Sequence, residues 1–348
     1  MLQDIALDTF MEKRRNGELL VVDVRSPGEY RDATIPGSLN IPLFDDAERA
    51  EIGTIYKQVS VEAAKQRGLE IVSVKLPAFV RQFAELPGKT AVFCWRGGMR
   101  SRTTATVLSL MGIQAFRLTG GYRAYRRAVV QALEEMAFAP RAIVLHGNTG
   151  SGKTAILRDL KARGYPVLDL EGLAGHRGSV FGHIGLHSRN QKTFDALLFD
   201  ELKRYEDAPY VLMEAESKRI GKVTMPGMLQ RKKEEGLHVW MELPIEARVK
   251  TILDDYRPEE NRQACREAFR LIKSRLHTPV AAEIESHLDE GRYDQAVERM
   301  LTHYYDPRYA FSSESYVPEA AAVIRADRPE DAADTLARIV DRHSTVPS

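Results

Sequence analysis

Short apolar runs alternate with helically spaced segments along the first part of the chain. The runs ELLVVDV (residues 18–24) and KTAVFC (89–94) predict buried strands. Apolar residues recur at helical spacing in SRTTATVLSLMGI (101–113) and YRAYRRAVVQALEEMA (122–137), and QAFRLTGGY between them predicts a strand and a glycine turn. This β/α alternation indicates a mostly parallel sheet covered by helices.

The segments that join these elements predict a turn, an extended segment and the end of a helix. SPGEY, directly after the first strand, predicts a turn, and SLNIPL predicts an extended segment. Pro140 closes the helix at 122–137. We therefore place a domain boundary after this helix, with one domain at residues 1–137 and a second at 138–348.

The second part of the chain restarts the pattern. RAIVLHGNTGSGKTAILRDLKARG (141–164) predicts a strand, a glycine-rich loop and a helix. PVLDLEG, PYVLMEAES and HVWMELP predict three further strands that end in acidic residues, and beyond about residue 246 the pattern becomes helical and charged. The sequence thus predicts an α/β fold: an N-terminal parallel sheet with helices, then an α/β domain with a helical C-terminal region.

Composition narrows the class of protein. The 348 residues are 43% hydrophobic and 28% charged, as in soluble globular proteins with room for two domains. No apolar run approaches the length of a membrane span, and the N-terminus lacks the pattern of a secretory signal. Two cysteines are too few for a disulfide framework, so we expect a cytoplasmic protein with no membrane partner. Of the two, Cys265 is expected to pack as a small apolar residue.

The net charge of +1 means that any nucleic-acid surface must be a local patch. Residues 96–133 contain no Asp or Glu but seven arginines: Arg96, Arg100, Arg102, Arg117, Arg123, Arg126 and Arg127. Most runs of charged residues are solvent-exposed faces of the protein. This run begins in a loop suited to anions, so a solvent-exposed face and a surface that contacts phosphates are equally good interpretations. Candidate nucleic-acid contacts come from it and from a second basic stretch: Arg123, Arg126, Arg127, Lys218 and Arg219.

One candidate site is the loop between the strand at 89–94 and the next helix, Cys94-Trp95-Arg96-Gly97-Gly98-Met99-Arg100. Backbone N–H groups in such a loop can form an anion nest at the helix N-terminus. Positive surroundings favour a nucleophilic thiolate, whereas a buried structural cysteine is the alternative. The loop predicts a catalytic Cys94 and an anion site formed by Arg96, Gly97, Gly98, Met99 and Arg100.

The second candidate site matches G-x-x-x-x-G-K-[ST] in full: Gly147, Asn148, Thr149, Gly150, Ser151, Gly152, Lys153 and Thr154. Its backbone N–H groups would cradle a diphosphate, with Lys153 on the outer phosphates and Thr154 towards a metal. The predicted strand before it and helix after it are the context that this P-loop motif requires. ATP and GTP are the usual ligands, but any compact pyrophosphate satisfies the same donors.

Acids at strand ends are candidates for positioning a metal ion such as Mg²⁺ or for acting as a base: Asp169, Glu171, Glu214 and Glu216. For each one, an exposed loop carboxylate or a helix cap is an equally good explanation. The loop LAGHRGSVFG follows closely, and its His176 and Arg177 predict a surface that faces a ligand. The metal itself stays unassigned.

The stretch VVDVRSPGEYRDATIPGSLNIPL (21–43) resembles the start of a rhodanese domain, and Cys94 falls where the sulfur-carrying cysteine of that family lies. The familiar Gly-His-Ile-Pro is Ala33-Thr34-Ile35-Pro36 here, a segment that we assign to structure. The cysteine loop has the spacing C-x5-R, which is similar to that of the rhodanese-fold phosphatases. Its length leaves phosphatase chemistry open, with Cys94 as nucleophile and Arg100 holding a phosphate.

A rhodanese-like half joined to a P-loop half resembles the tRNA 2-selenouridine synthase family over nearly the whole chain. Matching stretches besides the two loops are DDAERAEIGTIYKQ (45–58), GGYRAYR (120–126), LDLEGLAGHRGSVFG (168–182), EAESKRIG (214–221) and YYDPRY (304–309). The resemblance implies a transferase that converts wobble 2-thiouridine in the anticodon region of tRNA to 2-selenouridine.

The resemblance also implies two steps: geranyl diphosphate alkylates the sulfur, and selenium from selenophosphate then replaces the S-geranyl group. Cys94 would carry selenium as a selenosulfide, Arg96 and Arg100 would hold selenophosphate, and the P-loop would hold the geranyl diphosphate. The C-terminal helices would wall the ten-carbon chain. Two other classes stay open: a sulfurtransferase or phosphatase fused to a nucleotide-dependent kinase-like module, and a nucleotide-binding regulator whose rhodanese half senses anions.

Overall fold

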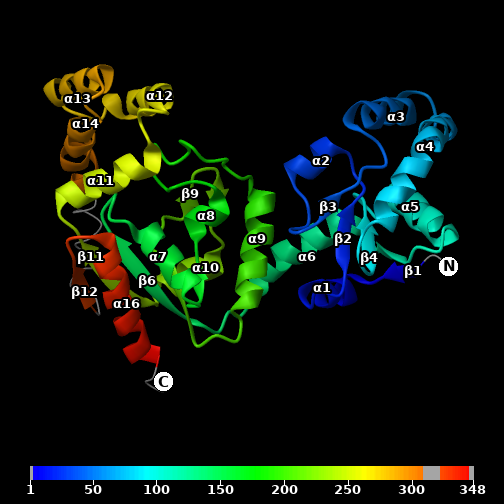
Figure 1. The fold of residues 1–348 in the computed structure, drawn as a ribbon, viewed down its shortest axis with the longest axis horizontal. Coiled ribbons are helices and arrows are strands. Elements are labelled where there is room, and N and C mark those ends of the chain that lie inside the picture. The colour runs from blue at the N-terminus through cyan, green and yellow to red at the C-terminus, as the bar shows by residue number, and fades with distance from the viewer. Residues whose placement is uncertain (1–2, 309–321, 345–348) are drawn as a thin grey trace. The chain divides into compact units, whose positions relative to one another are not determined.

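The computed structural model describes residues 3–308 and 322–344 of the chain (Figure 1). The chain divides into two compact units, which we call unit 1 (residues 1–132) and unit 2 (residues 133–348). The division falls inside a helix, whereas the sequence predicts the boundary after that helix, at residue 137. Each unit is described by itself.

Unit 1 is built on a five-stranded, all-parallel sheet with the order β1-β5-β4-β2-β3. Its strands are β1 (Gln3–Ile5), β2 (Leu20–Asp23), β3 (Leu39–Asn40), β4 (Thr90–Phe93) and β5 (Ala115–Leu118). Its helices are α1 (Leu7–Arg15), α2 (Pro27–Asp32), α3 (Asp46–Gln58), α4 (Val61–Ala84), α5 (Met99–Leu110) and α6 (Gly121–Glu135). The predicted parallel sheet is confirmed.

Both faces of this sheet are buried, as a parallel sheet requires. Val22 and Val92 point to one face and pack in a cluster with residues of α4 and α5. Phe93 points to the opposite face, where the buried Arg25 guanidinium lies 5.7 Å from its ring and 4.4 Å from the ring of Tyr122. The apolar runs at β2 and β4 are therefore continuous because both sides of each strand are covered.

The turn predicted at SPGEY is wrong, because helix α2 begins there. Ser26 precedes Pro27 at the first turn, and the Ser26 backbone N–H donates to the Glu29 carboxylate at 3.2 Å. Serine, proline at the first helical position and glutamate three residues after the cap form a helix-start signal. The Pro-Gly pair, which is common in turns, here occupies the first turn of the helix.

Unit 2 also has a five-stranded, all-parallel sheet, with the order β12-β11-β6-β8-β7, and a separate antiparallel pair β9-β10. Its strands are β6 (Arg141–Gly147), β7 (Val167–Leu168), β8 (Tyr210–Glu214), β9 (Arg219–Ile220), β10 (Val223–Thr224), β11 (Leu237–Glu242) and β12 (Ala322–Arg325). Its first helices are α7 (Lys153–Ala162), α8 (Leu170–Ala174), α9 (Gln191–Arg204) and α10 (Gly227–Glu234). The three further strands predicted from the sequence are confirmed as β7, β8 and β11.

The later helices form the predicted helical region. They are α11 (Ile245–Tyr256), α12 (Arg262–Lys273), α13 (Thr278–Glu290), α14 (Tyr293–Met300), the π-helical turn η1 (Leu301–Tyr305) and α16 (Pro329–Ser344). Helices α7 and α16 bury their apolar residues against the sheet, whereas residues of α11–α14 and η1 form a second cluster with the loop residues Phe181 and Ile184. Strand β12 corrects the expectation that everything beyond residue 246 is helical; it is a four-residue strand that pairs with β11.

Within the described residues, no helix has both the length and the apolar character needed to cross a membrane. The stretch YYDPRY ends at Tyr309, which lies outside the described residues.

Candidate active sites in the two units

The sulfur of Cys94 lies at the carboxyl end of β4, directly before α5. Its side chain is 3% exposed, and its Sγ lies 3.2 Å from the Ser101 hydroxyl oxygen. Gly98 is the residue that precedes the first turn of α5, so the loop from Cys94 to Gly98 curls over a helix N-terminus. This is the strand–loop–helix geometry that favours an anion.

The backbone of this loop is packed directly against the turn before α6. The Tyr122 and Arg123 N–H groups donate to the carbonyls of Cys94 and Trp95, both at 2.9 Å. Gly121 has φ of 59°, and a Cβ there would lie 2.2 Å from the Cys94 carbonyl oxygen and 2.4 Å from the Gly97 nitrogen. Only glycine permits this approach, which explains the Gly-Gly-Tyr sequence that follows β5.

Arg100 points to a carboxylate that sequence analysis did not find. Its Nη1 and Nη2 donate to the two carboxylate oxygens of Glu29 at 2.5 and 3.1 Å, and both side chains are about 20% exposed. Burial opposes charge on both groups, but their mutual bond dominates, so the pKa of Glu29 is lowered and that of Arg100 is raised. Arg100 thus stays charged beside the cysteine loop.

The other basic candidates have different surroundings. Arg96 and Met99 are exposed at the cysteine loop, and Arg117 pairs with the Asp4 carboxylate at 2.5 Å. Two of the seven arginines in the acid-free run are therefore neutralised by acids from distant segments. Candidates with exposed side chains are Arg123 and Arg127 on α6 and Lys218 and Arg219 at β9, whereas Arg126 is half-buried.

The segment Ala33–Pro36 has a structural role, as expected. Arg25 and Asp23 form a buried ion pair at 2.6 Å, with side chains 2% and 0% exposed. The Thr34 hydroxyl donates to Asp23 at 2.9 Å, and Arg25 donates to the Ala33 carbonyl at 2.6 Å. Thr34 therefore completes a buried polar network rather than facing a substrate.

In unit 2 the phosphate loop joins β6 to α7. Gly150 and Gly152 have φ of 81° and 76°, so the loop needs glycine at both positions. The Lys153 ammonium donates to the Gly147 carbonyl of its own loop at 2.7 Å. The buried Arg248 guanidinium of α11 donates to the Thr149 carbonyl at 3.0 Å and pairs with Asp306. Sequence analysis did not predict this contact with the phosphate loop.

Thr154 lies between two of the predicted carboxylates. Its hydroxyl oxygen is 2.7 Å from a Glu171 oxygen and 2.6 Å from a Glu214 oxygen. A hydroxyl has one proton to donate, so one of these short contacts needs a protonated carboxyl group. Burial, together with neighbouring carboxylates, raises the pKa of Glu171 to about 7 and that of Glu214 well above its ordinary value.

The remaining predicted residues differ in whether they reach the cavity above this loop. Glu216 and Arg177 line it, and Arg177 stacks over the Tyr256 ring at 4.9 Å. Asp169 instead accepts from the Gly172 N–H as the N-terminal cap of α8 and pairs with Arg158. His176 packs against Gly182 and Gly221, where a Cβ would lie 2.8 and 2.6 Å from its ring. Burial lowers the pKa of His176.

The cavity has a volume of about 620 Å³ and an aromatic wall that sequence analysis did not find. His146 stacks with Trp240 at 5.6 Å between ring centres, and its Nε2 lies 2.7 Å from Nδ1 of His238. Burial and the neighbouring His238 lower the pKa of His146 to about 3, so its ring is neutral at physiological pH. His146 lies on β6 opposite Trp240 of β11, and His238 lies two residues before Trp240, so only the sheet register brings the three rings together.

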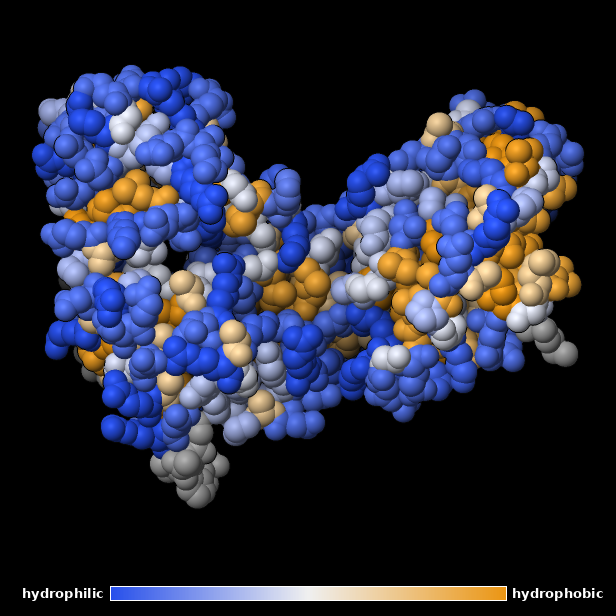
Figure 2. Space-filling view, viewed as in Figure 1, coloured by the Kyte–Doolittle hydropathy of each residue, from blue (hydrophilic) through white to orange (hydrophobic). Residues whose placement is uncertain are grey.

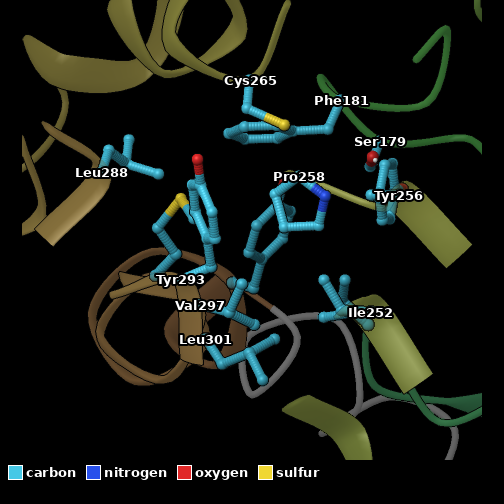
Figure 3. A pocket seen from close by; sticks show the side chains of 13 residues that line it. Ser179, Phe181, Ile252, Tyr256, Pro258, Cys265, Leu288, Tyr293, Val297 and Leu301 are labelled. Carbon is cyan, nitrogen blue, oxygen red and sulfur yellow. Dashed lines mark hydrogen bonds between the residues drawn. The ribbon is translucent and has the colours of Figure 1, made fainter. Parts of the chain in front are cut away.

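A narrow apolar pocket adjoins this cavity (Figure 3). Its volume is about 40 Å³, and it is lined by side chains that come mainly from α11, α14, η1 and the loop before α9, among them Phe181, Ile252, Tyr256, Leu288, Val297 and Leu301. The pocket and the cavity share five lining residues: Thr149 of the phosphate loop, Ser179, Ile252, Tyr256 and Tyr305. Cys265 lies in its wall, and burial raises the pKa of this thiol to about 11, as fits the expected apolar packing.

The oxygens of Thr154, Glu171 and Glu214 fit a hard divalent cation such as Mg²⁺. Such a cation binds through one or two carboxylates plus substrate phosphates, and it would replace the proton that the two buried carboxylates now require. Among residues 3–308 and 322–344, no group of three or more His, Cys, Asp or Glu side chains is arranged as a metal site. The remaining ligands would have to come from a bound diphosphate.

Comparison with known proteins covers both units. Residues 140–288 match the family model described as the AAA domain of tRNA 2-selenouridine synthase, and residues 6–128 match the model of the rhodanese-like domain. The tRNA 2-selenouridine synthase of Cupriavidus necator is 34% identical to the chain over 88% of the chain and 91% of that relative. The chain belongs to the tRNA 2-selenouridine synthase family.

Two further family members extend this similarity. The tRNA 2-selenouridine synthase of Bdellovibrio bacteriovorus is 32% identical over 84% of this chain and 89% of its own length. That of Pseudomonas savastanoi pv. phaseolicola is 31% identical over 92% of this chain and 95% of its own length. The family and the rhodanese-plus-P-loop organisation inferred from the sequence motifs are confirmed.

Proposed function

We propose that this protein is a cytoplasmic enzyme that modifies tRNA, converting 2-thiouridine at the wobble position to 2-selenouridine in two steps. Unit 2 would carry out S-geranylation with geranyl diphosphate, and unit 1 would carry out selenation with selenophosphate. The observation that carries the proposal is the phosphate loop whose cavity continues into an apolar pocket, because this pair of surfaces suits a diphosphate attached to a hydrocarbon chain.

In the first step, the thiouridine sulfur attacks C1 of the geranyl chain. The C1–O bond breaks, diphosphate leaves with the electron pair, and the base loses its N3 proton. Lys153 and the backbone N–H groups of the phosphate loop would stabilise the charge that develops on the departing diphosphate. Bound Mg²⁺ would supply further positive charge to the diphosphate oxygens.

The walls of the cavity suit the two partners of this step. The hydrocarbon chain would extend past Ile252 and Tyr256 into the apolar pocket, whose walls must separate because about 40 Å³ is too little for ten carbons. The acceptor base would stack on the wall of His146, His238 and Trp240. Glu216 also lines this cavity and can take the N3 proton.

In the second step, electron balance decides what Cys94 does. Selenium in selenophosphate is already at the oxidation level of selenide, so a selenosulfide on Cys94 would require the loss of two electrons to an acceptor. The two steps proposed here include no such acceptor. We therefore replace the selenosulfide expectation with phosphoryl transfer to Cys94, for which the C-x5-R loop spacing is suited.

The Cys94 thiolate would attack phosphorus, and the P–Se bond would break with its electron pair on selenium, giving phosphocysteine and hydrogen selenide ion. That ion adds to C2 of the alkylated base, and the C2–S bond breaks. Geranylthiolate leaves and takes a proton from solvent, while the selenium proton moves to N3. Water then hydrolyses phosphocysteine to phosphate. Arg100 and the loop N–H groups would hold the phosphoryl oxygens, and Ser101 would donate to the thiolate.

The tRNA would reach the protein through its exposed cations. Four candidates have exposed side chains that can contact phosphates: Arg123, Arg127, Lys218 and Arg219. Each contact would contribute to the salt dependence of tRNA binding. Half-buried Arg126 would contribute less.

The deciding experiment gives the full-length protein an anticodon stem–loop RNA with wobble 2-thiouridine. Geranyl diphosphate alone should yield S-geranyl-2-thiouridine by mass spectrometry, and added selenophosphate should yield 2-selenouridine with one phosphate released for each selenium incorporated. ATP or GTP hydrolysis with no prenyl diphosphate consumption would assign the P-loop to a nucleotide instead. Cys94-dependent release of phosphate from an aryl phosphate, with no selenium transfer, would favour the phosphatase alternative.

A further inference from the structure

A groove with a volume of about 850 Å³ runs along unit 1 between α3, α4 and the first turn of α5. Its floor is apolar and includes Leu43, Phe44, Ile52 and Val72. The volume is within the range of sites that bind small organic molecules. Nothing in the reaction described so far uses it.

Large apolar side chains remain exposed along this groove. Tyr56 is 59% exposed, Leu69 is 64% exposed, and Met99 is 59% exposed. Figure 2 shows hydrophobic residues gathered on the surface over α4 and α5. An apolar surface around a concave site is typical of a binding site rather than of scattered exposure.

The groove borders the cysteine loop. Met99, Arg100 and Thr103 form one of its walls and belong to the first turns of the helix that begins at that loop. Three floor residues, Leu43, Phe44 and Val72, pack in the same buried cluster as Cys94. A molecule seated in the groove would therefore contact Met99 and Arg100, at the end of the loop that begins with Cys94.

The charges along the groove have one sign. Its lining includes Arg49, Lys57, Lys65 and Arg100 and, among the described residues, no aspartate or glutamate. Glu29 pairs with Arg100 and lies 3.8 Å from Arg49, but it does not line the groove. Lys57 and Lys65 are exposed. An apolar floor with a cationic rim suits a ligand that has both a hydrocarbon chain and phosphates.

We propose that this groove binds the S-alkyl chain of the geranylated nucleotide during selenation, while the rim cations contact the RNA phosphates beside it. The proposal rests on the two-step function proposed above. It predicts that selenation in unit 1 is faster with a long S-alkyl group, because the bound chain would hold the base at the cysteine loop until the chain leaves as geranylthiol. Unit 2 would then have an apolar pocket for the chain as donor, and unit 1 a separate groove for the chain as leaving group.

The test uses the full-length protein with two synthetic stem–loops, one with S-geranyl-2-thiouridine and one with S-methyl-2-thiouridine, and selenophosphate. We expect the wild-type protein to form 2-selenouridine at least about tenfold faster from the geranyl RNA. Leu69→Asp places a charge at the groove and should bring the two rates close together. Val74→Asp is the matched control, because Val74 lies on the same helix, is 84% exposed and does not line the groove. It should keep the wild-type preference.

The outcomes separate this proposal from the function on which it rests. A wild-type ratio in Leu69→Asp, or an equal loss of both rates, would overturn the groove assignment while leaving the selenation step in place. No selenouridine from either RNA with the wild-type protein would instead overturn the proposed function. Geranylation of 2-thiouridine RNA by the same variants should be unchanged and reports on folding. If Leu69→Asp folds poorly, Tyr56→Ser at the same groove replaces it.

Discussion

The cysteine loop of unit 1 and the phosphate loop of unit 2 share a local design but differ in how their charged side chains are paired. Each joins a buried parallel strand to a helix N-terminus and depends on glycines with positive φ. Arg100 at the first loop is paired with Glu29, whereas Lys153 at the second donates to its own loop carbonyls. The phosphate loop additionally faces Glu171 and Glu214 through Thr154.

This difference indicates what each loop can do. The cysteine loop has a nucleophile and a cation with a rigid fork, which suits attack on a bound oxyanion. The phosphate loop has no cysteine and is backed by carboxylates that require a proton or a metal ion, which suits the departure of a diphosphate. We therefore expect a substitution in one loop to impair the step at that loop and to leave the step at the other loop in place.

The largest expected effect is at the nucleophile. Cys94→Ser should lower selenation by at least about a thousandfold, because a serine hydroxyl is a far weaker nucleophile than a thiolate at neutral pH. Geranylation in the same sample should be nearly unchanged, which serves as the internal control. Mass spectrometry of the RNA measures both products, and an equal loss of both would mean that the two loops form one functional unit.

Lys153→Ala should reverse this pattern. Loss of the fixed charge on the outer phosphates should lower geranyl transfer by roughly a hundredfold or more and weaken the binding of geranyl diphosphate in calorimetry. Selenation of RNA that is already geranylated should continue. Lys161→Ala is the control, because Lys161 lies on the same helix but pairs with Glu201. Undiminished affinity in Lys153→Ala would mean that the loop binds something else.

Arg100→Lys tests whether the fork, rather than the charge, matters at the cysteine loop. Lysine keeps the charge but loses the bidentate geometry, so selenation should fall by about ten- to a hundredfold, the equivalent of roughly 1.5 to 3 kcal/mol. Arg67→Lys, at an exposed arginine paired with Glu51 and Glu70, should have little effect. Selenation rates as high in Arg100→Lys as in the wild type would reduce Arg100 to a simple positive charge.

The smallest effect concerns the stability of unit 2. The pKa of Glu171 is raised from 4.5 to about 7, so the folded state binds more protons than the unfolded state between these pH values. The stability contribution of this group is therefore lost as the pH rises from about 4.5 through about 7. Glu171→Gln should gain stability relative to the wild type, on the order of 1 kcal/mol, between pH 5 and pH 6. Thermal unfolding at the two pH values measures this gain, and exposed Glu235→Gln, which should show none, is the control.

Local patterns were sufficient to predict both loops, because a continuous apolar strand, a glycine-rich loop and a helix are adjacent in the sequence. They could not predict the pair of Glu29 and Arg100, which are 71 residues apart and meet only when α2 packs near α5. The aromatic wall likewise depends on the register that places Trp240 opposite His146. Strand β12 could not be predicted because four residues are too few to show an alternation of apolar and polar positions. Its partner β11 is also distant in the sequence.

The short contacts of Thr154 with two carboxylate oxygens have a calorimetric consequence. When Mg²⁺ and a diphosphate bind, the proton held by the Glu171 and Glu214 carboxyl groups must leave, and the buffer takes it up. The measured heat of binding should then change with the ionisation enthalpy of the buffer, with a slope that counts the protons released. Proton release at pH 6 that decreases as the pH rises through about 7 would identify Glu171 as a source. Binding that releases no proton would place the cation elsewhere.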